Sequence, residues 1–547
     1  MHKADIIIVG GGLAGLVAAH EATNRGRSVI LVDQEGPQSL GGQAFWSLGG
    51  LFMVNTPEQR RMGIRDSKEL ALKDWLGSAQ FDRDADRMPR KWAEAYIEFA
   101  SGPMRDYLRA QGLRWFPVVG WAERGGEGAK GHGNSVPRFH ITWGTGQGIV
   151  ARFARCARDG NAVGLLRFAF RHKVTQLDIT NGRITGVSGQ YLADDYAPRG
   201  VSTSRKIKGD FTFTAENVII ASGGIGGDHN KVRALWPKDR LGAPPRRMLA
   251  GVPDYVDGQM QAVAKTAGAD AINEDRMWHY CEGIENWNPI WPNHGIRILP
   301  GPSSIWLDAT GERMEPPCLP GFDTLSTLKR ILSTGHDHSW FILTQKIIEK
   351  EFGLSGSEQN PDLTSGKWLN VLRERLGKGA TGAVEAFKEK GSDFVVAHDL
   401  ETLVSKMNKL TSEAPLDGTH IRAQIAARDA AVSDSQVEDA QIRAIHYART
   451  YRGDRLIHTA KPHAILDPDN GPLIAVRLNI LTRKSLGGLH TNLHSQVLRP
   501  DGTVFDGLFA AGEVAGFGGG GYHGYNALEG TFLGGCIFSG LKAGQIA

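Results

Sequence analysis

Three glycines near the start of the chain have the spacing of a turn that binds a nucleotide. Gly10, Gly12 and Gly15 stand between an apolar run over residues 5–9 and a helical pattern. In such a strand–turn–helix unit, the first glycine makes the tight turn, the second admits a pyrophosphate, and the third lets helix and strand pack closely. The next apolar run ends at Asp33, where an acid can bind a ribose hydroxyl. The unit predicts a dinucleotide-binding site.

A second glycine-rich loop follows this unit. Gly41-Gly42 and Gly49-Gly50 flank Gln43 and Ser47. Such a backbone can run beside a flat ring and offer N–H groups to its heteroatoms. An ordinary loop would have the same composition, so this segment alone leaves both interpretations open.

Further motifs make the chain similar to a known group of flavoproteins, the fumarate reductases, succinate dehydrogenases and 3-ketosteroid dehydrogenases. The resemblance covers most of the chain, and its motifs match that group in order and spacing. They are Gly10-x-Gly12-x-x-Gly15, Ala221-Ser222-Gly223-Gly224, Asp257-Gly258-Gln259-Met260, Gly311-Glu312-Arg313-Met314, Ser485-Leu486-Gly487-Gly488-Leu489 and Gly507-Leu508-Phe509-Ala510-Ala511-Gly512-Glu513.

The resemblance implies a non-covalently bound FAD. By this likeness, Asp33 binds the adenosine ribose, Val174 lies by the adenine, and Glu513 holds the ribityl or ribose region. Glycine-rich segments at both ends of the chain independently favour FAD over NAD, because FAD is wrapped by several distant segments and no second GxGxxG unit is present. The residues expected to bind FAD are Gly10, Gly12, Ala14, Gly15, Asp33, Gln34, Gly41, Gly42, Gln43, Ser47, Gly49, Gly50, Val174, Ala221, Ser222, Gly223, Gly512, Glu513 and Gly530.

A change in composition along the sequence divides the chain into an α/β domain and an insertion. We expect a Rossmann-like (GR2-type) FAD-binding domain from residues 1–239 and 471–547, and an α+β capping domain over 240–470 that covers the substrate. The insertion is rich in Trp, Pro and His, and residues 338–352 are among its predicted helical stretches.

A flavin beside a buried substrate transfers a hydride while a protein group handles a proton. The resemblance implies desaturation of a CH–CH bond next to a carbonyl, or the reverse reduction. His279 and Arg313 fall where fumarate reductases have a cap histidine and a proton-donating arginine, but Ala527 stands where their carboxylate clamp has an arginine. A small dicarboxylate substrate is therefore the second choice, and a bulky apolar ketone such as a 3-ketosteroid is preferred. The electron acceptor stays unidentified.

The steroid dehydrogenase pattern instead places a tyrosine before a glycine-rich turn to bind the substrate carbonyl. Tyr522 has this position, and Tyr525 is the alternative if the register shifts. Both tyrosines could also simply pack beside the flavin. Likewise, His279 could be a core histidine, and Arg313 could pair with a buried acid.

Aromatic side chains in the cap could line a pocket for a large flat ligand or form the core of the cap itself. They are Trp278, Tyr280, Trp287, Trp291 and Trp306. A flavin-binding scaffold without turnover is the alternative of another class.

Composition excludes other classes of protein. The net charge of +4 on 547 residues shows no basic block, which argues against nucleic-acid binding. No apolar run is long enough to span a membrane, and the N-terminus lacks a signal-peptide pattern. Four separated cysteines fit a reducing cytoplasm. His336-Asp337-His338 has no third residue at metal-ligand spacing, so no metal site is expected.

Overall fold

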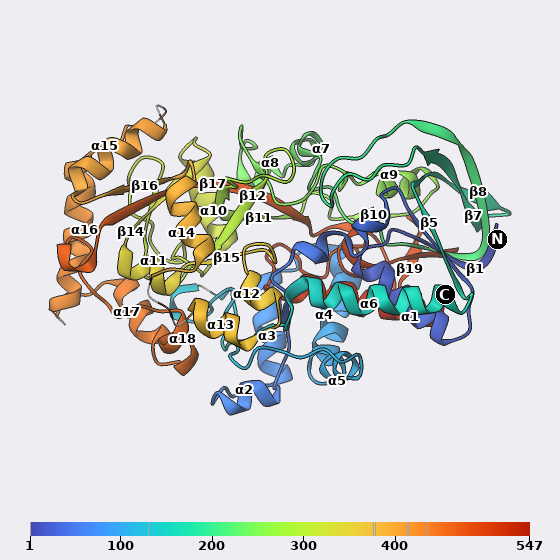
Figure 1. The fold of residues 1–547 in the computed structure, drawn as a ribbon, viewed down its shortest axis with the longest axis horizontal. Helices are drawn as coiled ribbons and strands as arrows, with labels where there is room; N and C mark the ends of the chain where they lie inside the picture. Colours follow the sequence, from blue (N-terminus) through green and yellow to red (C-terminus); the bar gives the residue numbers. More distant parts are fainter. Residues whose placement is uncertain are drawn as a thin grey trace.

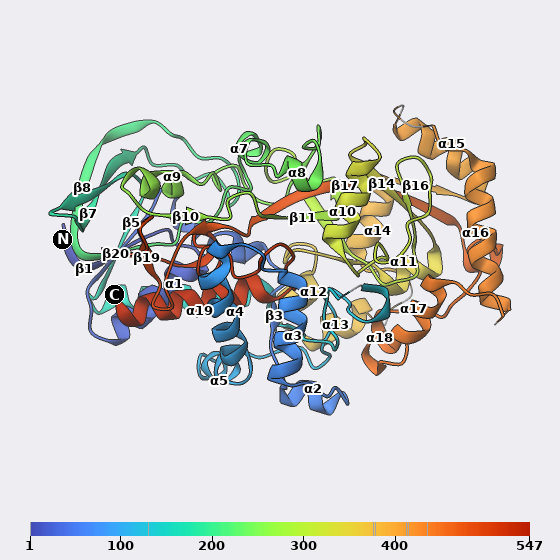
Figure 2. The ribbon, with the colours of Figure 1, turned by 180° about the vertical axis from the view of Figure 1, so that it is seen from behind.

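Two β-sheets at opposite ends of an elongated molecule organise the chain (Figure 1). The computed structural model describes residues 2–547 apart from 130, 376, 378, 412, 414 and 435. Both chain termini lie at the first sheet, and the second sheet is built from the middle of the sequence and one late strand (Figures 1 and 2). The molecule is therefore of mixed α/β class, with one segment inserted into the domain that holds the termini.

The first sheet is parallel at its centre. Its strands are ordered β19-β20-β8-β1-β2-β5, and the antiparallel hairpin β6–β7 joins it through β8. Ile6 and Ile8 point into one hydrophobic core, whereas Ile7 and Val9 point into another, as the two-residue period of a strand requires. The bounds are β1 Lys3–Val9, β2 Val29–Asp33, β5 Leu166–Phe170, β6 His172–Thr180, β7 Arg183–Leu192, β8 Ile207–Ile220, β19 Gln496–Leu498 and β20 Val504–Ala510.

Three helices cover one face of this sheet. Helix α1 (Leu13–Asn24) packs against α6 (Thr145–Ala162) and α19 (Thr531–Ile546). A Cβ on Gly540 of α19 would lie 2.5 Å from the carbonyl oxygen of Ala14. The last helix therefore packs closely on the first one, which explains why both ends of the chain share one domain (Figure 2).

The second sheet is antiparallel except where β9 joins it. Its order is β13-β14-β17-β11-β12-β15, and β9 and β16 also pair with β17. The bounds are β9 Leu249–Ala250, β11 Met277–Glu285, β12 Gly295–Leu299, β13 Ile305–Asp308, β14 His338–Thr344, β15 Gly353–Leu354, β16 Phe394–Ala397 and β17 Leu473–Ser485.

The predicted helix over residues 338–352 was wrong in its first half. Residues His338–Thr344 form strand β14, all of it buried, and only Gln345–Glu351 are helical. A fully buried strand reads as a continuous apolar run, and such a run lacks the alternation that identifies a half-exposed strand.

Strand β17 connects the two halves of the molecule. It begins at Leu473, pairs at the centre of the second sheet, and runs toward the first domain (Figure 1). The segment after it returns to the first domain, where β18 (Gly488–Leu489) pairs with β10 (Ala271–Ile272). The domain bounds stay a prediction. Strand β17 of the capping sheet begins at Leu473, just after residue 470, where the capping domain was predicted to end.

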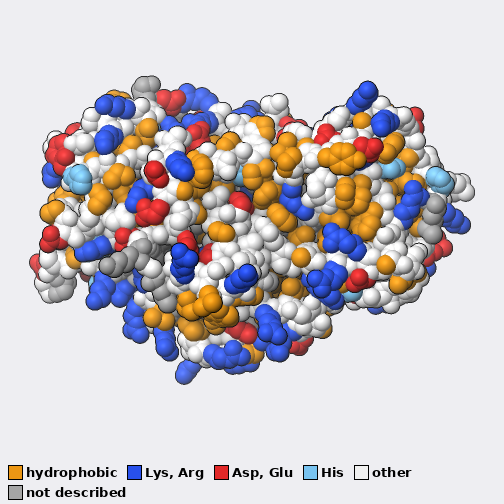
Figure 3. All heavy atoms as spheres, in the orientation of Figure 1, with side chains coloured by type: hydrophobic (Ala, Val, Ile, Leu, Met, Phe, Trp, Pro, Cys, Tyr) orange, Lys and Arg blue, Asp and Glu red, His pale blue; other side chains and the backbone are white. Residues whose placement is uncertain are grey.

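The remaining elements surround these two sheets. They are β3 Gly50–Phe52 and β4 Phe139–Ile141, which pair with each other, and the helices α2 Pro57–Arg61, α3 Lys68–Ala79, α4 Arg87–Ala100, α5 Pro103–Ala110, α7 His229–Ala234, α8 Lys238–Leu241, α9 Gln259–Thr266, α10 Thr324–Ser333, α11 Gln345–Glu351, α12 Pro361–Thr364, α13 Trp368–Arg375, α14 Gly382–Lys390, α15 Leu400–Leu410, α16 Gly418–Ser433, α17 Ala440–Ala448 and α18 Arg452–Ile457. Within the described part of the chain, no helix is both long and apolar enough to cross a bilayer. Basic and acidic side chains both occur across the face shown in Figure 3.

Candidate functional site

A cavity of about 220 Å³ is lined by both the glycine motifs of the first domain and residues of the capping sheet. Of the residues expected to bind FAD, all except Gly15 and Gly49 line it: Gly10, Gly12, Ala14, Asp33, Gln34, Gly41, Gly42, Gln43, Ser47, Gly50, Val174, Ala221, Ser222, Gly223, Gly512, Glu513 and Gly530. A Cβ on Gly15 would lie 2.1 Å from the carbonyl oxygen of Gly10, which fits the packing role expected for the third glycine.

The glycine turn leaves room where a pyrophosphate would bind. Gly10 has a φ of +110°, and a Cβ there would lie 2.5 Å from the carbonyl oxygen of Ala221. A Cβ on Gly12 would meet no protein atom closer than 3.8 Å, so a side chain at this position would extend into the cavity. Gly12 is also the N-cap of α1, whose first N–H groups favour an anion. These features fit FAD.

The second glycine loop is joined to this turn. The N–H of Gly41 donates to the carbonyl oxygen of Gly11 over 2.7 Å. Asp33 accepts from the N–H groups of Gly11 and Glu35, each over 2.8 Å. Burial raises the pKa of Asp33 to about 6, because these two hydrogen bonds only partly offset the loss of water. A ribose hydroxyl would add a further donor to this carboxylate.

Glu513 ties three distant segments together beside the cavity. It accepts from Nε2 of Gln43 over 3.0 Å and from the N–H of Ser485 over 2.9 Å. Nζ of Lys484 donates to Oε1 of Gln43 over 2.6 Å and lies 3.7 Å from Glu513. Burial lowers the pKa of Lys484, and the charge of Glu513 opposes this effect.

A polar cluster formed by cap residues and by Glu529, from the segment before the last helix, lies at the other end of the cavity. Oε1 of Glu529 accepts three hydrogen bonds: from the hydroxyl of Tyr280 over 2.6 Å, from Arg297 over 2.9 Å and from Nε1 of Trp278 over 3.2 Å. No described residue donates to the other oxygen, Oε2. Tyr280, Arg297 and Glu529 all line the cavity. The cluster thus fixes one oxygen of a carboxylate and leaves the other available.

Two further acids lie behind Arg297, away from the cavity lining. Its guanidinium is 3.2 Å from Oε1 of Glu123 and 3.4 Å from Oε2 of Glu282. Burial raises the pKa of Glu123 to about 8 and also raises that of Glu282. Glu123 is therefore mostly protonated at neutral pH, so Arg297 does not face three full negative charges.

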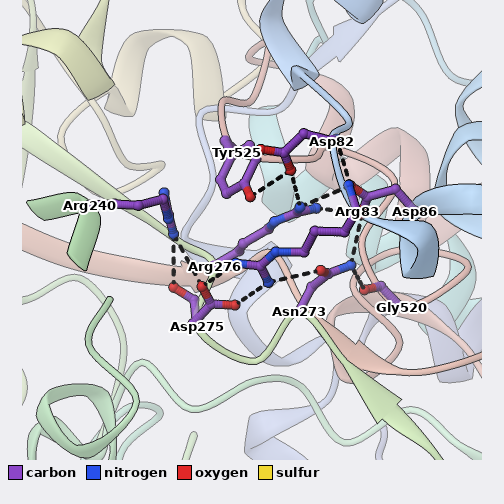
Figure 4. A network of polar contacts seen from close by, with 9 residues as sticks. All are labelled: Asp82, Arg83, Asp86, Arg240, Asn273, Asp275, Arg276, Gly520 and Tyr525. Atoms are coloured by element: carbon purple, nitrogen blue, oxygen red, sulfur yellow. Dashed lines mark hydrogen bonds and ion pairs between the residues drawn. The ribbon is translucent and has the colours of Figure 1, made fainter. Parts of the chain in front are cut away.

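Tyr522 and Tyr525 do not line the large cavity. The hydroxyl of Tyr522 donates to the carbonyl oxygen of Thr531 over 2.7 Å inside the core of the first domain. The hydroxyl of Tyr525 donates to Asp82 over 2.7 Å, and the guanidinium of Arg276 lies 3.9 Å from the centre of its ring (Figure 4). Of the same C-terminal segment, Phe517 and Glu529 face the cavity instead.

His279 and Arg313 also lie away from the large cavity. His279 lines a second cavity of about 10 Å³ together with Tyr525, and burial lowers its pKa to about 3. Arg313 makes two hydrogen bonds to the carboxylate of Asp439, over 2.6 and 3.1 Å. The alternatives considered from the sequence, a core histidine and an arginine paired with an acid, agree with these contacts.

Most of the aromatic residues named in the cap do not face the cavity. Of the five named from the sequence, only Tyr280 lines the cavity, whereas Trp278, Trp291 and Trp306 are buried and Trp287 is 40% exposed. Arg297 and Glu529 were not among the residues predicted from the sequence. An acid directly before Gly530, in a segment expected to bind FAD, was the one available signal for Glu529.

Comparisons with known proteins agree with this geometry. Residues 5–533 match the family described as FAD binding domain. The chain is 58% identical over 542 residues to a KsdD-like steroid dehydrogenase of Mycobacterium tuberculosis, covering 99% of this chain and 95% of the relative. It is 59% identical over 533 residues to a KsdD-like steroid dehydrogenase of Mycolicibacterium smegmatis, covering 97% and 96%.

A solved structure shares the fold. The 3-ketosteroid delta1-dehydrogenase from Sterolibacterium denitrificans, in complex with 1,4-androstadiene-3,17-dione, superposes with a TM-score of 0.69 at 16% identity. The match covers 100% of this chain and 99% of that one.

Proposed function

The chain belongs to the FAD binding domain family, and on that premise we propose that it is a dehydrogenase of steroid-like ketones. The reaction would remove two hydrogens from a CH–CH bond next to the carbonyl. Support comes from the KsdD-like relatives that match almost the whole chain, and from a cavity that continues from the glycine turn to a polar cluster in the cap.

We propose that the residues around the glycine turn hold FAD without a covalent bond. Gly12 would admit the pyrophosphate, Asp33 would bind the ribose, and the Gln43–Glu513–Lys484 cluster would hold the middle of the cofactor. When bound, FAD supplies the two-electron acceptor that a dehydrogenation needs. Precipitation with acid should release the yellow colour into solution, and a flavin that stays with the polypeptide would contradict non-covalent binding.

The observation that carries the proposed activity is the orientation of Glu529. Three donors hold its Oε1, no described residue donates to its Oε2, and the residue lines the cavity. A base within hydrogen-bond reach of a C–H group beside a carbonyl can remove its proton. We assign this role to Glu529, and we assign Tyr280 and Arg297 the role of orienting it.

The test is anaerobic mixing of the holoprotein with 3-ketosteroids, smaller ketones and succinate. We expect the flavin absorbance to bleach with the steroid ketones, and we expect a product lighter by two hydrogens in mass spectrometry. A flavin that stays oxidised with every ketone, and that is not reoxidised by any enone after chemical reduction, would refute the proposal and favour a scaffold without turnover.

The proposal also includes an electron acceptor and a location in the cell. The physiological electron acceptor is a separate molecule of unknown class, which a screen of quinones and dyes would identify. A reducing, cytoplasmic location is supported by four cysteines that are all free and mostly buried.

A further inference from the structure

Strand β17 has an irregularity where it borders the cavity. Trp278 pairs with Lys484 and His279 pairs with Thr482, so that Arg483 is the extra residue of a β-bulge. A bulge breaks the regular alternation of side chains and redirects the extra residue. Two consecutive residues, Arg483 and Lys484, therefore both line the cavity.

Two glycines leave the space that Arg483 occupies. A Cβ on Gly251 would lie 3.1 Å from Cγ and 3.2 Å from Cδ of Arg483. A Cβ on Gly226 would lie 2.7 Å from the Arg483 carbonyl oxygen. The stem of the arginine thus packs directly on backbone, which restricts where the guanidinium can lie.

The guanidinium of Arg483 has no hydrogen bond or ion pair with any residue that the structure describes. Arg483 is half-buried, and the fully buried arginines differ from it: Arg138 contacts two carboxylates, and Arg276 and Arg297 also face acids. The neighbouring Lys484 has Glu513 at 3.7 Å. Arg483 is thus a cation in the cavity wall that forms no ion pair with a described residue.

The charge of Arg483 acts on the cap end of the cavity. Burial raises the pKa values of Tyr280 and Glu358, the latter to about 7, and the charge of Arg483 opposes both rises. It also contributes to the lowered pKa of His294, which burial mainly causes. At the opposite end, Asp33 is influenced by Arg205 instead. The same charge contributes to the lowered pKa of Lys484, so Arg483 lies in the cavity wall between the Lys484–Glu513 contact and the cap end.

A cation that is partly withdrawn from water, as Arg483 is, loses hydration that an accompanying anion can replace. A guanidinium matches a carboxylate especially well, because its planar fork can donate two parallel hydrogen bonds. We propose that Arg483 binds a carboxylate of the substrate, so that the preferred substrate is an acidic polycyclic ketone. This inference rests on the proposed function, and it narrows the substrate class within it.

The test compares ligands that differ only in charge. The holoprotein is titrated with a 3-oxo-steroid carboxylic acid and with its methyl ester, and binding is followed by the change in flavin absorbance. Flavin reduction by both compounds is measured in parallel. The variants are Arg483→Gln and Arg483→Lys. The control is Arg25→Gln, because Arg25 is exposed and its substitution removes the same charge far from the cavity.

We expect the wild type and Arg25→Gln to bind the acid about 10- to 100-fold more tightly than the ester, as for a charged hydrogen bond. Arg483→Gln should abolish this preference without loss of FAD, and Arg483→Lys should keep part of it. Equal binding of acid and ester by the wild type would overturn the inference. An equal loss of affinity for acid and ester in Arg483→Gln would also overturn it, because the guanidinium would then bind the ketone. A loss of FAD from Arg483→Gln would overturn it as well, because the guanidinium would then bind the cofactor. If no ketone reduces the flavin but the preference for the acid persists, the proposed function fails and the carboxylate site stands.

Discussion

Replacing Glu529 by Gln is the sharpest test of the catalytic assignment. The carboxylate accepts from Tyr280, Arg297 and Trp278 through Oε1 alone. A glutamine has the same shape, and its amide oxygen can accept the same three bonds. The substitution therefore removes the basic second oxygen, which has no donor among the described residues, while keeping the side chain in place.

The expected loss follows from this geometry. General acid–base catalysis typically contributes about 10²–10⁴-fold to a rate, so flavin reduction should slow by about 10³-fold, or about 4 kcal/mol in activation free energy. The assay is anaerobic stopped-flow reduction by a steroid ketone that the wild type accepts. FAD content and the visible spectrum should be unchanged, because Glu529 is at the cap end of the cavity.

Glu123→Gln is the matched control. Burial raises the pKa of Glu123 to about 8, so this acid is mostly protonated at pH 7 and its replacement removes little charge. Its carboxyl oxygen lies 3.2 Å from the same Arg297. We expect a rate within a few fold of the wild type. Reduction of Glu529→Gln at the wild-type rate would refute the base assignment, and equal losses in both variants would show that the acid cluster matters only as a whole.

Four further predictions follow from the same contacts. Gly12→Val should yield FAD-poor, nearly colourless protein, because the side chain would enter the cavity; full occupancy measured by absorbance would contradict the pyrophosphate assignment. Tyr522→Phe should reduce at close to the wild-type rate and lose about 1 kcal/mol of stability with its hydrogen bond to Thr531; a loss of 10²-fold or more in rate would restore the carbonyl-binding role. Fumarate should support turnover far below about 10 per second with a reduced dye, because Ala527 replaces the clamp arginine; a rate near that figure would show that other residues form a clamp. Folding raises the pKa of Glu123 from 4.5 to about 8, so its protonated form contributes stability that is full below pH 4.5 and is lost as the pH rises toward 8. The melting temperature of the wild type should therefore fall more steeply over this pH range than that of Glu123→Gln. Parallel curves of melting temperature against pH would contradict the raised pKa.

The cofactor half of the site could be predicted from the sequence because its requirements are local. Gly10 needs a positive φ, Gly12 must lack a side chain, and Asp33 must end the second strand. Each requirement acts on a few consecutive residues, so it leaves a recognisable spacing. The resemblance to flavoproteins of this group, carried by the same motifs and by the segment that ends at Glu513, was confirmed by the family match.

Only the tertiary structure brought together the residues that we propose for catalysis. Tyr280, Arg297 and Glu529 come from two strands of the cap and from the segment before the last helix, and their contacts depend on how that segment folds back. Tyr522 has the expected position in the sequence, but its turn directs the hydroxyl to Thr531 in the core.

The position of Arg483 in the cavity wall also depends on the tertiary structure. Its side chain reaches the cavity because of a bulge between two strands that are about 200 residues apart in the sequence. Strand alternation read from the sequence would send Arg483 and Lys484 to opposite faces. The pairing register, the burial of a side chain and the charges around it all depend on contacts between segments that are far apart in the chain. The sequence therefore determined that the chain carries an FAD binding domain, and the packing of the cap determined which side chains line the cap end of the cavity.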